Sequence, residues 1–242
     1  MVGSNKKQQQ MKGKLLIVLT ISFMITNFTL GQESKAGANF TRTMVDKDFS
    51  PDKVYYKETG KKMPLSEFRI ITQGGRVYFE REIDEEGNVI RYFYDPNNQK
   101  DRTVSTIAEK TLLPNFKLTT IDKKHIELKN LIGKLVILRF ELEANSFRFK
   151  KQEIAALDKK INALSNKNDV EAIIIFSCGE DEVRKGFDID NSNFKLVAGG
   201  ENFIIKYDIH TFPSTLLIDQ DGKLIENLSN TEDIILEDYL KK

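Results

Sequence analysis

The sequence contains very few side chains that bind metals or exchange electrons. Among its 242 residues there is one cysteine, Cys178, and there are two histidines, His125 and His210. A single cysteine excludes an intrachain disulfide and any site that needs two thiolates from this chain. Two histidines are few for a metal centre, and we expect both to be ordinary surface or loop residues. The composition therefore predicts no metal site and no cofactor.

An excess of charge of one sign is also missing. The chain has 37 lysines and arginines against 36 aspartates and glutamates, which gives a net charge of +1. No basic patch with interleaved aromatic residues occurs, so nucleic acid is not an expected partner. Hydrophobic residues make up 40% and charged residues 30% of the chain, a composition that can fold as a soluble globule. The length allows one large domain, or two small ones, plus a targeting segment.

The N-terminal segment has the pattern of an export signal. Four lysines precede an uncharged apolar run over residues 15–30, and Gly31 and a polar stretch come after it. A basic region, a short apolar region and small residues at its end are typical of a secretory signal peptide. The apolar run is shorter than the roughly 20 residues that a membrane-spanning helix needs.

The same pattern predicts where the signal is removed. Thr29 and Gly31 suit the −3 and −1 positions, so we expect a signal peptide over 1–31 and cleavage near Gly31. The mature protein is then periplasmic or extracellular, and an uncleaved signal would be its only contact with the membrane. A retained membrane anchor is the alternative, and Met11 is an alternative start.

A polar, disordered leader is expected over 32–48, and a small β-rich segment over 49–96. Strands are predicted at 54–56 and in two runs on either side of a Glu-Gly-Asn turn, which is a hairpin signal. A short helix is expected to begin near Pro64. The segment is too small to bury a large core, so we expect it to pack on the C-terminal part of the chain. Residues 97–111 are polar, which is typical of a linker.

The remaining segment, 112–242, alternates between strand and helix patterns. Continuous apolar runs at 134–140 and 170–176 suit strands that are covered on both faces. Such alternation predicts an α/β fold with parallel strands. Further strands are expected at 116–119, near 126, at 215–219 and at 223–225; helices are expected at 146–164, 180–187 and 202–207, and from Thr231 to Leu240 with Asn230 or Thr231 as the cap.

One local signature within this segment is distinctive. Phe212-Pro213-Ser214-Thr215 begins a predicted strand, which ends in Ile-Asp-Gln-Asp-Gly-Lys. Together with Leu113-Pro114-Asn115-Phe116 and Glu153-Ile154-Ala155-Ala156-Leu157, it resembles the thioredoxin-like exported thiol–disulfide oxidoreductases near TlpA and ResA and the related AhpC/TSA peroxidases. The resemblance covers roughly 112–242. It implies a thioredoxin-like α/β fold, in which helices flank a central mixed sheet.

The chemistry of that family is missing from the matching positions. In the family, the strand that matches 134–140 leads into a Trp-Cys-x-x-Cys loop at a helix N-terminus. The helix dipole and free N–H groups there lower the pKa of the first thiol, and the second cysteine resolves the mixed disulfide. Matching on 153–157 places the two cysteine positions at Phe147 and Lys150, and neither is a thiol. Related peroxidases also place their attacking cysteine at this helix, so the resemblance implies a degenerate site.

The single thiol lies elsewhere in the pattern. Cys178 comes after the strand predicted at 170–176, so it could lie near the functional edge of the sheet. Its neighbours Glu180, Asp181 and Glu182 are acidic, and negative charge disfavours a thiolate. We expect Cys178 to be a passive small residue, and a reactive thiol is the alternative.

Pro213 is the clearest functional position that the resemblance implies. The matching proline in the family is cis and lies beside the active loop, where its neighbouring backbone can pair with an extended peptide. Thr211, Phe212, Pro213 and Phe147 are therefore candidate binding residues. The alternative is that Pro213 only shapes the start of a strand.

The aromatic and basic run at 147–151 has a simpler interpretation than a peptide surface. Phe149 would pack in the core, and Arg148, Lys150 and Lys151 would form a solvated face. Copper-handling relatives of this fold use a histidine near the position of His210 together with two cysteines. Without those thiolates, a tight copper site is not expected.

Three functions remain open from the sequence. The leading hypothesis is a non-catalytic module that binds a protein or an extended peptide in the cell envelope, or that supports an envelope assembly. The second is a thiol-dependent oxidoreductase or peroxidase-like enzyme that uses Cys178. The third is that residues 49–96 bind the partner and the rest is scaffold. No Ser-His-Asp order, metal-ligand spacing or phosphate loop supports other catalysis.

Overall fold

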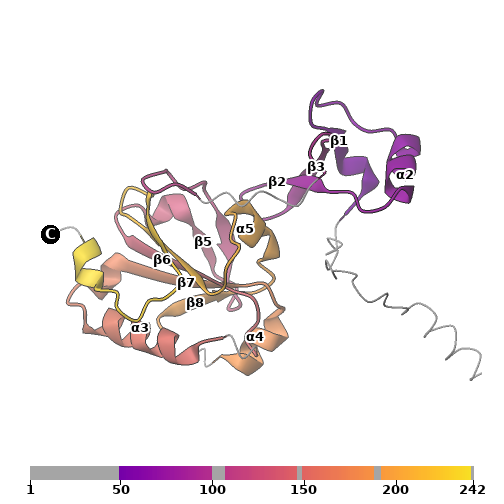
Figure 1. The fold of residues 1–242 in the computed structure, drawn as a ribbon. Coiled ribbons are helices and arrows are strands. Elements are labelled where there is room, and N and C mark those ends of the chain that lie inside the picture. Colours follow the sequence, from indigo (N-terminus) through magenta and orange to yellow (C-terminus); the bar gives the residue numbers. More distant parts are fainter. Residues whose placement is uncertain (1–48, 100–106, 146–148, 188–191, 241–242) are drawn as a thin grey trace, which may run out of the picture. The chain divides into compact units, whose positions relative to one another are not determined.

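A computed structural model describes most of the chain beyond the N-terminal segment (Figure 1). The predicted signal peptide at 1–31 and leader at 32–48 lie outside the described residues. None of the helices in the described part is both long and apolar enough to cross a membrane. The described residues are 49–99, 107–145, 149–187 and 192–240, and they belong to one compact unit, Lys47–Lys242.

A small sheet forms the first part. β1 (Val54–Tyr56) runs parallel to β3 (Val89–Tyr94), and β2 (Phe79–Ile83) pairs antiparallel on the other side of β3. The hairpin predicted around the Glu-Gly-Asn turn is confirmed, although its first strand begins at Phe79 rather than at residue 76. A 3-10 turn (Pro51–Lys53) precedes β1. The predicted helix forms as α2 (Leu65–Gln73), and it packs on a small core that contains Val54, Met63, Val89 and Tyr92.

The second part is built on a five-stranded sheet in the order β10-β9-β6-β7-β8. β6, β7 and β8 are parallel, whereas β9 is antiparallel to β6 and β10 is antiparallel to β9. All seven residues of β6 and of β7 are buried, as their continuous apolar runs predict. The strands are β6 (Leu135–Glu141), β7 (Val170–Phe176), β8 (Phe194–Val197), β9 (Ser214–Ile218) and β10 (Leu224–Leu228).

Helices and a hairpin cover the two faces of this sheet (Figure 1). One face packs against α3 (Lys151–Ala163) and α4 (Glu180–Gly186). The other packs against α5 (Glu201–Lys206) and the hairpin of β4 (Lys117–Thr119) and β5 (His125–Glu127), which continues into a 3-10 turn (Leu128–Leu131). A mixed sheet between helical layers is the thioredoxin-like fold that the resemblance implies.

The predicted C-terminal helix is wrong. Only a 3-10 turn (Leu236–Tyr239) forms between Thr231 and Leu240. Thr231 is 2% exposed and donates both its N–H and its hydroxyl to Glu153. Because Thr231 is fixed in this way, and Ile234 and Leu236 pack into the core, the segment forms separate short turns instead of a continuous α-helix.

Two other elements differ from the sequence prediction. β8 was not predicted, because Phe194-Lys195-Leu196-Val197 is short and a lysine interrupts its apolar pattern. α3 begins at Lys151 rather than at residue 146, and Phe149 and Lys150 come before its first turn. Another 3-10 turn (Lys167–Asp169) leads from α3 towards β7.

Candidate functional site

The residues around Pro213 lie at the carboxyl end of the central strand β6. Ser214 pairs with Phe140 near the end of that strand, so the residues before Ser214 lie at the end of the sheet where β6 finishes. The peptide bond between Phe212 and Pro213 is cis. Pro213 is buried, Phe212 is half-buried against the core, and Thr211 is exposed. Thr211 and part of Phe212 therefore remain accessible to a partner.

Of the two positions that match the family's cysteines, the structure describes only Lys150. Phe147 and Arg148 lie outside the described residues. Lys150 lies just before α3 with its side chain 50% exposed, and its Nζ is 3.9 Å from Glu153 Oε2. Phe149 is 8% exposed and packs edge-on against Phe176, with ring centroids 5.4 Å apart. The prediction that Phe149 belongs to the core is confirmed.

A buried ionic cluster lies beneath this end of the sheet. Arg139 on β6 is fully buried, and its Nε donates to Glu141 Oε1 at 2.7 Å. Its two terminal nitrogens donate to the two carboxylate oxygens of Glu153 on α3, at 3.2 and 3.3 Å. The main-chain N–H and the hydroxyl of Thr231 also donate to Glu153 Oε1, at 2.7 and 2.8 Å. Arg139 thus links the strand, the helix and the C-terminal segment.

This cluster was not predicted from the sequence, although a signal was present. Arg139 and Glu141 interrupt the apolar run of β6, and charged residues are almost never fully buried unless they are paired. A pair of charges inside a buried strand therefore indicates a third partner elsewhere in the chain. The sequence could not identify Glu153 as that partner, because its position on the buried side of α3 depends on tertiary packing.

The two carboxylates of the cluster are in different electrostatic environments. Burial raises the pKa of Glu141 above its ordinary value, and Arg139 only partly offsets the effect. Burial also acts to raise the pKa of Glu153, but hydrogen bonds from Arg139 and Thr231 outweigh it, so the net pKa is lowered. Glu153 is therefore the stable anion that balances the Arg139 guanidinium.

Cys178 is poorly placed for thiol chemistry. It is half-buried just after β7, and its N–H donates to Leu142 O at 3.1 Å. Burial raises the pKa of its thiol to about 11, and the Glu182 carboxylate adds to the effect. In the sheet order, β7 and β9 lie on opposite sides of β6, so Cys178 and Pro213 adjoin strands that are not neighbours. Both residues lie at the same end of the sheet, and the end of β6 lies between their strands.

The two histidines have ordinary side-chain partners. His210 Nε2 lies 3.0 Å from Asp208 Oδ1, and His125 Nδ1 lies 3.2 Å from Thr119 Oγ1. Among the residues that the structure describes, no three His, Cys, Asp or Glu side chains are grouped so that they could hold one metal ion.

Sequence comparison identifies a matching family and several similar proteins. Residues 110–227 match the model of the AhpC/TSA family. The thiol-disulfide oxidoreductase ResA of Bacillus anthracis is 31% identical over 134 residues, which cover 53% of this chain and 75% of that protein. ResA of Bacillus cereus (strain ATCC 10987 / NRS 248) is 33% identical over 146 residues, with the same coverage.

The chain is also similar to solved structures. The thioredoxin domain of a thiol-disulfide oxidoreductase from Bacteroides vulgatus matches 56% of this chain and all of its own, with a TM-score of 0.48 and 20% identity. A thiol peroxidase from Chromobacterium violaceum matches 54% of this chain and 81% of its own, with a TM-score of 0.43 and 16% identity.

Proposed function

Because this chain belongs to the ResA-like thiol–disulfide oxidoreductases of the thioredoxin fold and has a single cysteine, we propose that it is an exported, non-catalytic module that binds an extended segment of a protein in the cell envelope. Dithiol exchange proceeds through a mixed disulfide that a second thiol resolves. No second thiol exists anywhere in the sequence. The proposal keeps the fold of the family and its partner-binding edge and leaves out its redox step.

The observation that carries this proposal is the state of the one thiol. A pKa of about 11 leaves about one Cys178 in ten thousand ionised at pH 7. The buried cluster beneath α3 supplies no compensating positive charge, because two carboxylates already share the Arg139 guanidinium. The chain therefore lacks both the second thiol and the electrostatic setting of a reactive first one.

The proposed binding surface consists of Thr211, Phe212 and Pro213. Thr211 is exposed and Phe212 is half-exposed, so an approaching strand meets a main chain that is accessible and an aromatic side chain. Strand addition obtains its affinity from main-chain hydrogen bonds and its specificity from adjacent side-chain contacts. An extended protein segment is the partner that such a surface suits.

Two measurements test this proposal. The first is the reduction of a disulfide-containing model protein by the purified chain and by its Cys178→Ser variant, with dithiothreitol as the electron source. We expect neither to exceed the dithiothreitol background. Turnover that Cys178→Ser abolishes would refute the non-catalytic assignment.

The second measurement concerns binding. Envelope proteins that co-purify with the chain are compared for wild type, Thr211→Arg and the matched control Thr111→Arg, which replaces another exposed threonine. We expect Thr211→Arg to lose the partner and Thr111→Arg to keep it. Equal retention by both variants would remove Thr211 from the binding surface. Truncation to residues 111–242 would then show whether residues 49–96 bind instead.

A single-thiol enzyme is the second candidate, and family membership is the observation in its favour. An oxidoreductase or peroxidase-like mechanism would need the Cys178 thiolate. Its raised pKa predicts slow alkylation by iodoacetamide at pH 7 compared with a free cysteine. Alkylation faster than that of free cysteine would favour this candidate over the binding module.

Export forms part of the same proposal. The predicted signal peptide implies that the mature chain begins near Gln32 and lies in the periplasm or outside the cell. Mass spectrometry of the N-terminal peptide from fractionated cells tests this. An intact N-terminus in the membrane fraction would instead indicate a retained anchor.

A further inference from the structure

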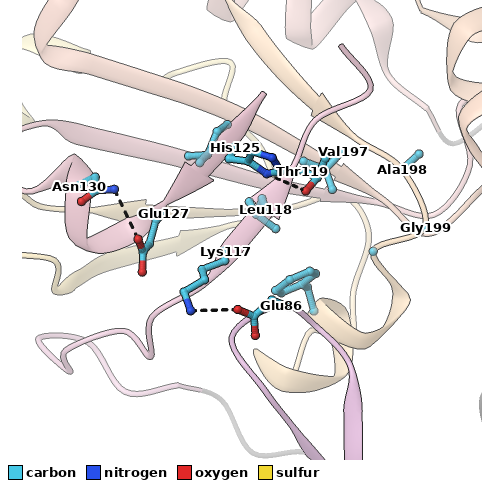
Figure 2. Close-up of a pocket in the computed structure, with 13 residues that line it drawn as sticks. Glu86, Lys117, Leu118, Thr119, His125, Glu127, Asn130, Val197, Ala198 and Gly199 are labelled. Carbon is cyan, nitrogen blue, oxygen red and sulfur yellow. Dashed lines mark hydrogen bonds and ion pairs between the residues drawn. The ribbon is translucent and has the colours of Figure 1, made fainter. Parts of the chain in front are cut away.

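A cleft of about 490 Å³ lies between the β4–β5 hairpin and the carboxyl end of β8 (Figure 2). Its volume is in the range of ligand-binding pockets. Lys117, Thr119 and His125 line one side, and Ala198 and Gly199 line the other. None of the proposed binding residues around Pro213 lines this cleft, so it is a separate site.

On the β4 side of the cleft, the outer strand edge is occupied at Lys117, whose N–H donates to Glu85 O at 2.7 Å, so the open main-chain groups are those of Thr119. Phe116 O accepts from Leu128 N–H at 3.1 Å, and Thr120 N–H donates to Lys124 O at 2.9 Å. Since pairing alternates along an antiparallel strand, the main-chain groups of Thr119 face away from β5. Within the described residues, no main-chain group outside the hairpin forms a hydrogen bond with them.

The facing side is the outer edge of β8. β8 pairs with β7 along its inner edge. On the outer edge, Leu196 O accepts from Ile121 N–H at 2.8 Å. In the described part of the chain this is the single main-chain hydrogen bond between the β4 side and β8. Thr119 and Ala198 lie beyond it and both line the cleft, so the two strand edges meet at Ile121 and separate from there.

The floor and the rim of the cleft favour a peptide with a basic side chain. Four large apolar residues contribute to its lining, namely Leu118, Ile126, Val197 and Phe203. At the rim, Lys117 Nζ lies 2.9 Å from Glu86 and 3.0 Å from Glu85, so two carboxylates share one ammonium. Figure 2 shows the Lys117 ammonium joined to the Glu86 carboxylate. Lys206 also interacts electrostatically with Asp84, Glu85 and Glu86, so three carboxylates face two ammonium groups here. The remaining negative charge complements lysine or arginine.

We propose that this cleft binds an extended peptide as an additional strand between β4 and β8, with a lysine or arginine side chain beside Glu86. A free strand edge pairs readily with another main chain. An extended peptide presents donors and acceptors on both of its edges, so it can pair with Thr119 and Ala198 at once. The apolar lining then takes the side chains that point inward.

Selection of peptides provides the test. Random 12-residue peptides displayed on phage are selected on the purified full-length chain, and the selected sequences are synthesised. We expect alternating apolar residues around a lysine or arginine. Methylation of single peptide N–H groups should weaken binding about tenfold at every second position, because each removes one main-chain hydrogen bond. Tolerance of methylation at all positions would overturn the proposal, as would failure to select any peptide.

Two protein variants test where the selected peptide binds. Thr119→Pro removes an N–H that β5 does not use, so the hairpin is retained while binding falls about tenfold. Glu86→Gln should weaken peptides with a basic residue, whereas Glu58→Gln, an exposed control, should not. Thermal unfolding verifies that each variant is folded. If the selected peptides bind Thr211→Arg more weakly but bind Thr119→Pro as well as wild type, their binding site is the Pro213 surface. That result would overturn this proposal and leave the proposed function intact.

Discussion

Replacing Glu153 by glutamine should destabilise the protein strongly, because it leaves a buried guanidinium short of its counter-ion. In the native protein, Arg139 donates two hydrogen bonds to Glu153 and one to Glu141. Breaking a buried ion pair by neutralising one partner typically costs about 3–5 kcal/mol. Glutamine keeps an oxygen that can still accept from Thr231, so we expect about 3 kcal/mol, near the lower limit.

The assay is thermal unfolding followed by circular dichroism. For a domain of 150–250 residues, each kcal/mol lowers Tm by about 2–4 °C, so Glu153→Gln should lower it by about 6–12 °C. Glu232→Gln is the matched control, because Glu232 is exposed and its replacement should cost less than about 0.5 kcal/mol. A loss below about 1 kcal/mol for Glu153→Gln would refute the view that this cluster stabilises the fold.

The same variant has a predicted pH dependence. The pKa of Glu153 lies below its ordinary value of 4.5, so its contribution is present above that pH and is lost as the pH falls through the folded pKa. Glu141 has a raised pKa, so its contribution has the opposite sign and is lost as the pH rises through its folded pKa. The stability difference between wild type and Glu153→Gln should therefore shrink below pH 4.5. A constant difference from pH 7 down to pH 3 would contradict this assignment.

Three further changes have specific outcomes. The rate of Cys178 alkylation should rise with pH up to about pH 11, and a plateau reached by pH 9 would contradict the raised pKa of the thiol. Gly87→Ala should lower the free energy of unfolding by more than Gly60→Ala: both have positive φ, but only at Gly87 would the added Cβ lie 2.6 Å from the Phe203 ring. Equal losses in denaturant unfolding would contradict this contact. Lys206→Met should lower the free energy of unfolding by about 1–3 kcal/mol, because the Lys206 ammonium donates to two main-chain carbonyls. Amide hydrogen exchange at residues 84–88 should become faster in this variant, and unchanged exchange would contradict this role.

The regular part of the fold could be predicted from the sequence because its signal is local. The apolar run at 134–140 and the one at 170–176 become two fully buried neighbouring strands. The C-terminal segment shows the limit of such reasoning. Its local pattern favours a helix, but Thr231 bonds to Glu153, which is 78 residues away in the chain. Helix propensity is a weak preference that tertiary contacts override.

The features of the candidate site also differ in how far the sequence predicts them. Pro213 could be put forward as a candidate binding residue because its neighbours form a local motif, and the presence of a single cysteine is read from the sequence alone. The cleft beside β8 could not be predicted, because it depends on where two strand edges separate. That separation results from the path of the chain after Ala198, where Gly199 N–H donates to Cys178 O and Gly200 N–H donates to Phe176 O. These bonds turn the main chain back towards β7, so it cannot continue along β4.

The buried cluster affects the electrostatic potential at the start of α3. A reactive cysteine at the start of α3 would need net positive potential to stabilise its thiolate. Beneath that helix, Arg139 supplies one positive charge, Glu141 and Glu153 oppose it with two carboxyl groups, and the half-exposed Lys150 lies 3.9 Å from Glu153. Glu153 also lies in the first turn of α3, where a carboxylate is stabilised by the helix dipole that would otherwise favour a thiolate. The cluster that holds strand, helix and C-terminal segment together therefore supplies no net positive potential for a thiolate at this position.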